Sequence, residues 1–419
     1  SNLAGIFQAF TRMYEDSSVR KHEVALLKGD VRPLSDRRLW KPALQAIAAT
    51  MMQGETKVDF RVAIHRDEAE QELSRIFPNE KFPVRDILDD LLKYHLLQNR
   101  SADQIEFRHQ LIQEYYAAEY LLRLLPDLTD EELKRDYLNL LKWTEPIALM
   151  LALMDNEAQA LRVVKLAMDD VDLMLGARLA GSTRLAFQKK TIDFIQLSSY
   201  KISPLFRVIL LRETQSTSAA KYLTEALNFE NSFVKINAIN ALGFIHSERS
   251  FQTLVKILKE SETLSGYAAE ALGMMGDERS IPYLRKLLES GELHSGKNAA
   301  YALARIDSKD ARDALFNAIT NKNESTRLNA LIALANLEEA LSPIEYDIIK
   351  DKCKNDNSIV VRRGALSTLK KHSRIDLELI ENILSDNESS IIHGDIISLL
   401  PDYLKDDCFY LLENLYQKG

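Results

Sequence analysis

One short pattern occurs four times in the middle of this chain: Ala238-Ile-Asn-Ala241-Leu242-Gly243, Ala268-Ala-Glu-Ala271-Leu272-Gly273, Ala299-Ala-Tyr-Ala302-Leu303-Ala304 and Ala330-Leu-Ile-Ala333-Leu334-Ala335. In each copy, small residues stand four places and one place before the leucine. Small side chains at this spacing let one helix lie close to the next, while the leucine fills the space between them. The pattern therefore predicts a stack of closely packed helices.

The leucine of this pattern recurs at intervals of 30 to 35 residues over most of the chain. Its positions are Leu149, Leu179, Leu210, Leu242, Leu272, Leu303, Leu334, Leu369 and Leu399. A second apolar helix follows each copy, as in residues 251–258, where Leu254, Ile257 and Leu258 keep the spacing of one helical face. Self-similarity at this period predicts an α-solenoid. The longest interval, from Leu334 to Leu369, indicates either a loop insertion or a kink in the stack.

Two short helices per unit, with Ala-x-x-Ala-Leu-Gly cores, resemble HEAT repeats of the short bacterial kind. The resemblance covers about residues 145 to 419, with about nine helix pairs expected over 127–419. It implies an extended surface that suits binding a partner, most naturally a protein, better than catalysis.

The first 140 residues do not repeat, and their pattern predicts a different domain. Apolar spacing favours helices over 3–14, 40–51, 67–76 and 84–94, a strand over 58–64, and a hairpin formed by 96–99 and 104–107. This order of helix, strand, two helices and hairpin is that of a winged helix. The overall fold class is therefore mostly α: an N-terminal helical and winged-helix domain followed by an α-solenoid.

The hairpin is followed by Glu106-Phe107-Arg108-His109-Gln110-Leu111-Ile112-Gln113-Glu114-Tyr115-Tyr116-Ala117-Ala118-Glu119-Tyr120-Leu121. This stretch resembles the Phe-x-His-x-x-x-Gln-Glu-Tyr-x-Ala-Ala signature that closes the winged-helix domain of NACHT proteins, which are signal-transducing NTPases. The resemblance implies a helical linker at 1–35, a winged helix at 36–126 and the solenoid at 127–419. It also implies that His109 contacts the phosphate of ADP bound in a nucleotide domain; alternatively, His109 is only a polar residue at a domain junction.

Together the two resemblances look like the C-terminal half of a cyanobacterial-type NACHT protein. The chain begins Ser1-Asn2 without a methionine, so we expect its nucleotide-binding domain upstream, with ATP or ADP and Mg²⁺ bound there and no cofactor in this chain. Gly291-Glu-Leu-His-Ser-Gly296-Lys297-Asn298 is the only near match to a phosphate-binding loop. It ends in Asn298, follows a predicted helix and lies at a turn between units, so we do not expect this chain to be an enzyme.

Four cations are candidates for the binding surface of the solenoid: Lys235, Arg327, Arg362 and Arg363. The first three recur seven places before the leucine. Such residues alternatively pair with the neighbouring unit and stabilise the stacking. A nucleic-acid partner is not expected, because the helix over 84–95, which would enter a groove, carries Asp86, Asp89 and Asp90.

Bulk properties agree with a cytoplasmic protein. The formal net charge is -8, and no apolar run is long enough to span a bilayer. The two cysteines, Cys353 and Cys408, form neither a metal motif nor a disulfide framework. Two other functions stay open: a stand-alone HEAT scaffold, and a protein like the bacterial lyases that attach bilin chromophores, although the His109 motif is foreign to those lyases.

Overall fold

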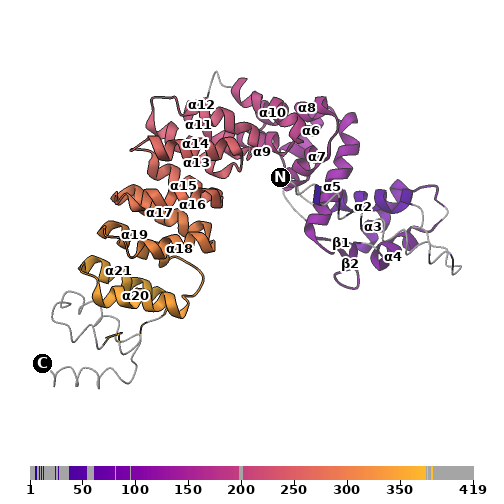
Figure 1. The fold of residues 1–419 in the computed structure, drawn as a ribbon. Helices are drawn as coiled ribbons and strands as arrows, with labels where there is room; N and C mark the ends of the chain where they lie inside the picture. The colour runs from indigo at the N-terminus through magenta and orange to yellow at the C-terminus, as the bar shows by residue number, and fades with distance from the viewer. Residues whose placement is uncertain are drawn as a thin grey trace. The chain divides into compact units, whose positions relative to one another are not determined.

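The computed structural model describes residues 37–53, 61–80, 82–94, 96–197 and 202–373, with a few single positions outside these ranges. The described chain is mostly helical and divides into two compact units, Ser1–Ala219 and Ala220–Gly419 (Figure 1). The expected helix over 3–14 and the expected end of the repeat array near residue 419 lie outside the described ranges. The division at residues 35 and 126 stays a prediction.

The first unit combines a small antiparallel sheet with helices. Its main elements are α2 (Arg37–Met52), β1 (Ala63–His65), α3 (Arg66–Ile76), α4 (Val84–Tyr94), β2 (Leu97–Asn99), β3 (Gln104–Phe107), α5 (Gln110–Leu124), α6 (Asp130–Leu133), α7 (Thr144–Leu153), α8 (Glu157–Asp170), α9 (Leu173–Ser182), α10 (Leu185–Leu197) and α11 (Pro204–Glu213). Short 3₁₀ and π turns connect some of them: η2 (Leu125–Asp127), η3 (Lys134–Leu138), η4 (Leu141–Trp143) and η6 (Thr217–Ala219).

The sheet has the strand order β1-β3-β2, with both pairs antiparallel. Ile64 lies opposite Ile105, and Leu97 lies opposite Phe107; all four side chains are buried. Alternation of apolar and polar residues produces this one-sided burial, because successive strand residues point to opposite faces. The predicted order of elements and the predicted hairpin are confirmed. Of the strand expected over 58–64, residues 58–60 lie outside the described ranges, and β1 itself begins at Ala63.

A polar network ties α2 to α5 within this unit. The Glu119 carboxylate accepts hydrogen bonds from the Tyr115 hydroxyl at 3.0 Å and from Nε2 of Gln45 at 3.2 Å, and it pairs with Nζ of Lys41 at 2.9 Å. The buried faces of both helices supply the hydrophobic part of the contact. The middle of α5 is therefore held against α2.

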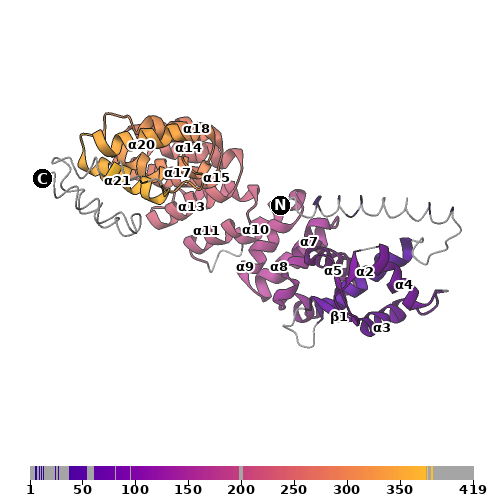
Figure 2. The same cartoon turned by 90° about the horizontal axis from the view of Figure 1, so that it is seen from below.

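The second unit is a stack of helices and short connections (Figures 1 and 2). Its elements are α12 (Ala220–Ala226), α13 (Ser232–Phe244), α14 (Glu248–Glu260), α15 (Ser265–Met275), η7 (Glu278–Ser280), α16 (Ile281–Glu289), α17 (Leu293–Ile306), α18 (Lys309–Ala318), α19 (Glu324–Leu334), α20 (Pro343–Asn355) and α21 (Ile359–Lys371). Polar side chains cap many helix starts, including Asn231, Ser247, Ser308, Asn323 and Ser358.

The recurring leucine falls on every second helix, as the period predicts. Eight of the nine positions are described, and each is at most 6 % exposed. They lie on α7, α9 and α11 in the first unit and on α13, α15, α17, α19 and α21 in the second. Leu399 lies outside the described residues. The α-solenoid is thus confirmed in the described part of the chain.

Neighbouring leucine-bearing helices approach each other at small residues. A Cβ atom placed on Gly243 would lie 2.8 Å from the carbonyl oxygen of Ala271, and one on Gly273 would lie 2.6 Å from Cα of Ala302. These separations are shorter than real Cβ contacts, so only glycine fits there. Each glycine follows a recurring leucine and meets the alanine that precedes the next one, which explains why the pattern needs small residues at these places.

The long interval between Leu334 and Leu369 is a loop insertion. Residues 335–342 connect α19 to α20, whereas residues 307–308 alone connect α17 to α18. Leu337 and Leu341 are buried and anchor the insertion to the stack.

No helix in the described ranges combines the length and apolar character that crossing a membrane requires.

We expect Gly273→Ala to destabilise the second unit by about 1–3 kcal/mol, because the new methyl group overpacks the contact between α15 and α17. Gly296→Ala is the matched control. A Cβ there meets only Nδ2 of Asn329 at 3.3 Å and otherwise ordinary contacts, so the gain in helix propensity should offset any strain. Urea denaturation followed by circular dichroism measures both, and equal stability of the two variants would contradict the close contact.

Candidate functional site

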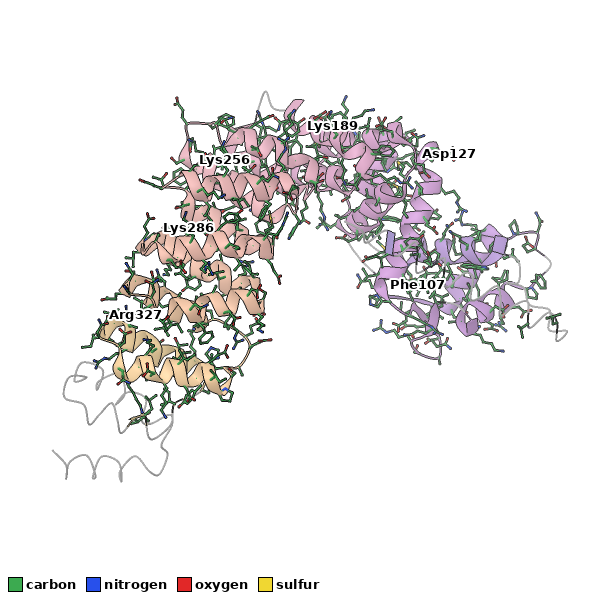
Figure 3. All side chains as sticks on the ribbon, viewed as in Figure 1. Phe107, Asp127, Lys189, Lys256, Lys286 and Arg327 are labelled. Atoms are coloured by element: carbon green, nitrogen blue, oxygen red, sulfur yellow. The ribbon has the colours of Figure 1, made fainter. Side chains whose placement is uncertain are left out.

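His109 stands at the junction between the sheet and α5, two residues after Phe107, which Figure 3 labels. It is the N-cap of α5, with extended backbone angles, and its ring Nδ1 accepts a hydrogen bond from the backbone N–H of Leu111 at 3.2 Å. In the neutral ring the proton then lies on Nε2, which makes Nε2 a donor. Because His109 is exposed at a helix N-terminus, where the dipole favours anions, it is suited to donate to an anionic group.

The three residues of the motif that follow His109 face into the unit. Gln113 donates from Nε2 to the carbonyl oxygen of Arg61 at 3.2 Å and is 1 % exposed. The Tyr115 ring packs edge-on against Tyr116, with centroids 5.6 Å apart. Glu114 is buried as well, and its carboxylate accepts a hydrogen bond from Nε2 of Gln110 at 2.9 Å. These contacts fit packing roles and leave His109 as the outward-facing polar group of the motif.

Burial raises the pKa of Glu114 above the usual carboxylate range. The hydrogen bond from Gln110 opposes this shift, the charge of Glu145 adds to it, and His109 opposes it. Glu114 therefore costs stability when it ionises.

The predicted binding cation Arg327 lies within the solenoid rather than on its surface. It is 6 % exposed, and Figure 3 labels its position on α19. Its guanidinium donates to both carboxylate oxygens of Asp356, at 2.9 and 2.8 Å, and to Oδ1 of Asn357 at 2.9 Å. The remaining donors reach the carbonyl oxygens of Asn321 and Lys322. All five N–H groups are used, so Arg327 joins one repeat to the turn of the next, as the stacking alternative expects.

The other three predicted cations differ from Arg327 in their surroundings. Arg362 donates from Nε to the carbonyl oxygen of Asp356 at 2.6 Å and so supports the same turn. Lys235 is half-buried and lines a shallow hollow of about 490 Å³ together with Lys256 and Glu260. Arg363 is exposed on α21. The structure therefore does not bring the four cations together into one basic surface.

A larger hollow of about 620 Å³ lies on the face formed by α15, α17 and the insertion after α19; we call it the α17–α19 hollow. Its polar lining consists of Glu270 from α15, Asn298, Tyr301 and Arg305 from α17, Asp307 from the following turn, and Asn336 and Glu338 from the insertion. Ala302 and the buried Leu337 contribute apolar lining. Sequence reasoning did not select these residues; the one signal for them was the long interval between Leu334 and Leu369.

Arg312 of α18 fixes the insertion that borders this hollow. Its guanidinium donates to both carboxylate oxygens of Glu345, at 2.6 and 2.9 Å, to Glu339 at 2.9 Å and to the carbonyl oxygen of Ala340 at 3.2 Å. Glu345 also closes the capping box that begins α20 at Ser342. Glu338, next to the anchored Glu339, is thereby held at the hollow.

The near match to a phosphate-binding loop is mostly helical. Gly291 occupies a left-handed turn with φ of 78°, and α17 begins two residues later, so Gly296 and Lys297 lie inside this helix. The preceding element is the helix α16, whereas a phosphate-binding loop follows a strand. In the ranges that the structure describes, no three His, Cys, Asp or Glu residues form a group that could hold a metal ion.

Comparison with known families supports the helical stack directly. Residues 296–370 match the family model described as HEAT repeats, and residues 266–290 match the model described as PBS lyase HEAT-like repeat. The stack from α15 to α21 is a HEAT-repeat α-solenoid. No curated protein matches the sequence. HEAT repeats commonly form scaffolds for protein interactions, which is the functional class that this solenoid indicates.

We expect Glu114→Gln to raise stability at neutral pH. The folded state binds the Glu114 proton more tightly than the unfolded chain does, so its contribution is fully present at low pH and is lost as pH rises through the raised pKa. The advantage of the variant should therefore shrink on acidification. Urea denaturation at several pH values between 4 and 8 measures this.

Glu132→Gln is the control with the opposite sign. Hydrogen bonds from the backbone and hydroxyl of Thr129 lower the pKa of Glu132, so this variant should lose stability at neutral pH, and the loss should shrink as pH falls. If the change in the free energy of unfolding varied with pH in the same direction in both variants, burial would not be the cause of the raised pKa of Glu114.

We expect Arg327→Met to destabilise the solenoid by about 3–5 kcal/mol, because the buried carboxylate of Asp356 loses its bidentate partner. The carboxylate keeps the backbone N–H of Ser358 at 3.0 Å and Nζ of Lys352 at 4.0 Å. Arg285→Met, which removes an exposed pair with Glu289, should cost at most about 1 kcal/mol. Urea denaturation compares the two, and a cost below about 1 kcal/mol for Arg327→Met would argue that Arg327 is not a structural clamp.

Proposed function

We propose that this chain is the regulatory and sensor part of a NACHT-type signalling NTPase of the cytoplasm. The observation that carries the proposal is the placement of His109. It lies in the NACHT-like motif, caps α5 through Nδ1 and is exposed, so Nε2 can donate to an anion outside the unit. In the resembled family this histidine contacts the phosphate of ADP.

The first unit supports this proposal through the order of its elements. A helix, a strand, two helices and a hairpin precede α5, and the sheet order β1-β3-β2 suits a winged helix. The helix α4 carries Asp86, Asp89 and Asp90, and Asp89 is paired with Arg66, which favours packing between domains over binding to nucleic acid. We propose that this winged helix packs against a nucleotide domain in the complete protein.

In the proposed mechanism, the solenoid binds a protein ligand and the winged helix relays its occupancy. ADP, held in part by His109, favours a closed state, and the ligand favours an open one. A ligand shifts this equilibrium only by as much as it binds one state better than the other. ATP, ADP and Mg²⁺ belong to the nucleotide domain, and this chain contributes no catalytic residue.

A second candidate is a bilin lyase-like HEAT protein, because residues 266–290 match the PBS lyase HEAT-like repeat. Incubating the chain with a bilin and a light-harvesting apoprotein tests it, since covalent attachment changes the absorbance of the chromophore. A stand-alone HEAT scaffold is the third candidate, and it predicts that the coding sequence upstream of Ser1 contains no in-frame phosphate-binding loop.

We expect His109→Leu to weaken ADP retention in the protein extended through its upstream coding sequence, because leucine cannot donate to a phosphate. Release of fluorescent ADP measures the effect, which should be about tenfold for a lost charge-assisted hydrogen bond. His246→Leu, at an exposed position of the solenoid, is the control. Unchanged ADP release in His109→Leu would rule out the sensor role.

A further inference from the structure

Helix α5 is buried on every side over about two of its turns. Residues 112–118 are consecutive, and each of them is at most 7 % exposed. A stretch of this length turns through almost two full revolutions, so it has no face that is open to solvent. A helix that is covered all round lies inside a core and not at its edge. Helix α5 is therefore a central element of the first unit.

Helices from two parts of the sequence cover α5. One is α2, which belongs to the sheet part of the unit, by which we mean the elements from α2 to β3. The other is α7, the first of the leading solenoid helices, by which we mean α7 to α11; both α2 and α7 contact α5. Glu119 joins α5 to Lys41 and Gln45 of α2. On the side of α7, the charge of Glu145 helps to raise the pKa of the buried Glu114. The sheet part and the leading solenoid helices thus share α5 as a common core.

Polar side chains also fix the connection between α5 and α7. Arg162 of α8 donates to the carbonyl oxygen of Leu128 at 2.6 Å and pairs with Asp130 at 2.7 Å. Lys134 and Asp170 form a further ion pair at 3.0 Å, again between this connection and α8. A hinge needs residues that are free to change their backbone angles. Because α8 holds the connection at several points, it is poorly suited to act as a hinge.

Similar joints continue through the leading solenoid helices. Arg184, just before α10, donates to the carbonyl oxygen of Leu153 at the end of α7, at 2.9 Å. Gln188 of α10 donates to the carbonyl oxygen of Thr183 at 2.8 Å and accepts a hydrogen bond from the Ser216 hydroxyl at 2.6 Å. Gln188 and Ser216 are buried, so separating these helices would leave polar groups unsatisfied. Each helix of the series is therefore held to the next by bonds that are costly to break.

We propose that α5 couples the leading solenoid helices to the sheet part, so that the first unit opens and moves as one body and a change at α7 to α11 reaches His109. His109 is the N-cap of α5, and its Nδ1 accepts from the N–H of Leu111, so a displacement of α5 carries His109 with it. The coupling is a property of the fold and applies to any function of the chain. Its effect on ADP rests on the proposed function.

Amide hydrogen exchange of the whole chain, followed by mass spectrometry of its peptides, tests the coupling. Leu179→Ala removes a fully buried leucine from α9. It should lower the protection of the slowest amides in α9, β3 and α5 by the same factor, at least about tenfold, because they open together. Leu303→Ala is the matched control, since Leu303 holds the same place in the repeat on α17 and is equally buried. It should lower protection around α17 and change that of α5 less than about twofold.

If Leu179→Ala does not fold, Ile192→Val on α10 and Ile349→Val on α20 give the same comparison with a loss of about threefold to tenfold, since both side chains are buried. A loss of protection that stays within α7 to α11 would place a hinge before α7 and overturn the proposal. An equal loss in α5 from the variants of α17 or α20 would overturn it as well, because the body would then not end with the first unit.

The coupling and the NACHT role fail separately. Hydrogen exchange involves no nucleotide, so protection lost together in α9 and α5 supports the coupling whatever His109 binds. If ADP release in the extended protein ignores His109→Leu, the NACHT role is rejected and the coupling stands.

Discussion

The close approach of successive leucine-bearing helices is the constraint on which the second unit depends. Gly243 and Gly273 leave no room for a side chain at the contact with the next helix. Because the backbones nearly touch there, the alanines and leucines around them must fit one arrangement, and the same spacing repeats from α13 to α17. Each repeat is then stable only through its neighbours, which is the usual property of a solenoid. The surface groups on α15 and α17 come together only because these helices lie so close.

Arginines perform different tasks in this solenoid according to what surrounds them. Arg327 is enclosed by one carboxylate, one amide and two carbonyl groups, and its role is to join two repeats. Arg312 is less buried and holds the insertion by the same bidentate geometry to Glu345. In both cases the planar guanidinium satisfies several acceptors at once, which lysine cannot do. Of the recurring cations, Arg327 therefore joins two repeats and is not part of a binding surface.

The sequence predicted the helices and strands well, but it did not predict which residues lie together on the surface. The period of the leucine predicted every described repeat, because it follows directly from helix geometry. Two short segments on either side of a polar turn at 100–103 predicted the hairpin of β2 and β3. For the four cations the sequence left two roles open, a binding surface or pairing with the neighbouring unit. Their burial and their partners depend on residues about 30 positions away, such as Asp356 for Arg327. The lining of the α17–α19 hollow was missed because it comes from three separate segments.

The sequence by itself determined the solenoid, its period and the position of His109 in a motif at the end of the sheet domain. These depend on local spacing, and local spacing sets which face of a helix or strand is apolar. Only the tertiary structure decided that Arg327 is buried, that Nδ1 of His109 caps α5, and that the extra residues after Leu334 form an anchored loop beside Tyr301. The burial of Arg327 and the anchored loop depend on which distant groups meet a side chain, and packing between helices decides that. The cap of α5 is local, but it depends on the orientation of the His109 ring toward the N–H of Leu111, which sequence spacing does not set.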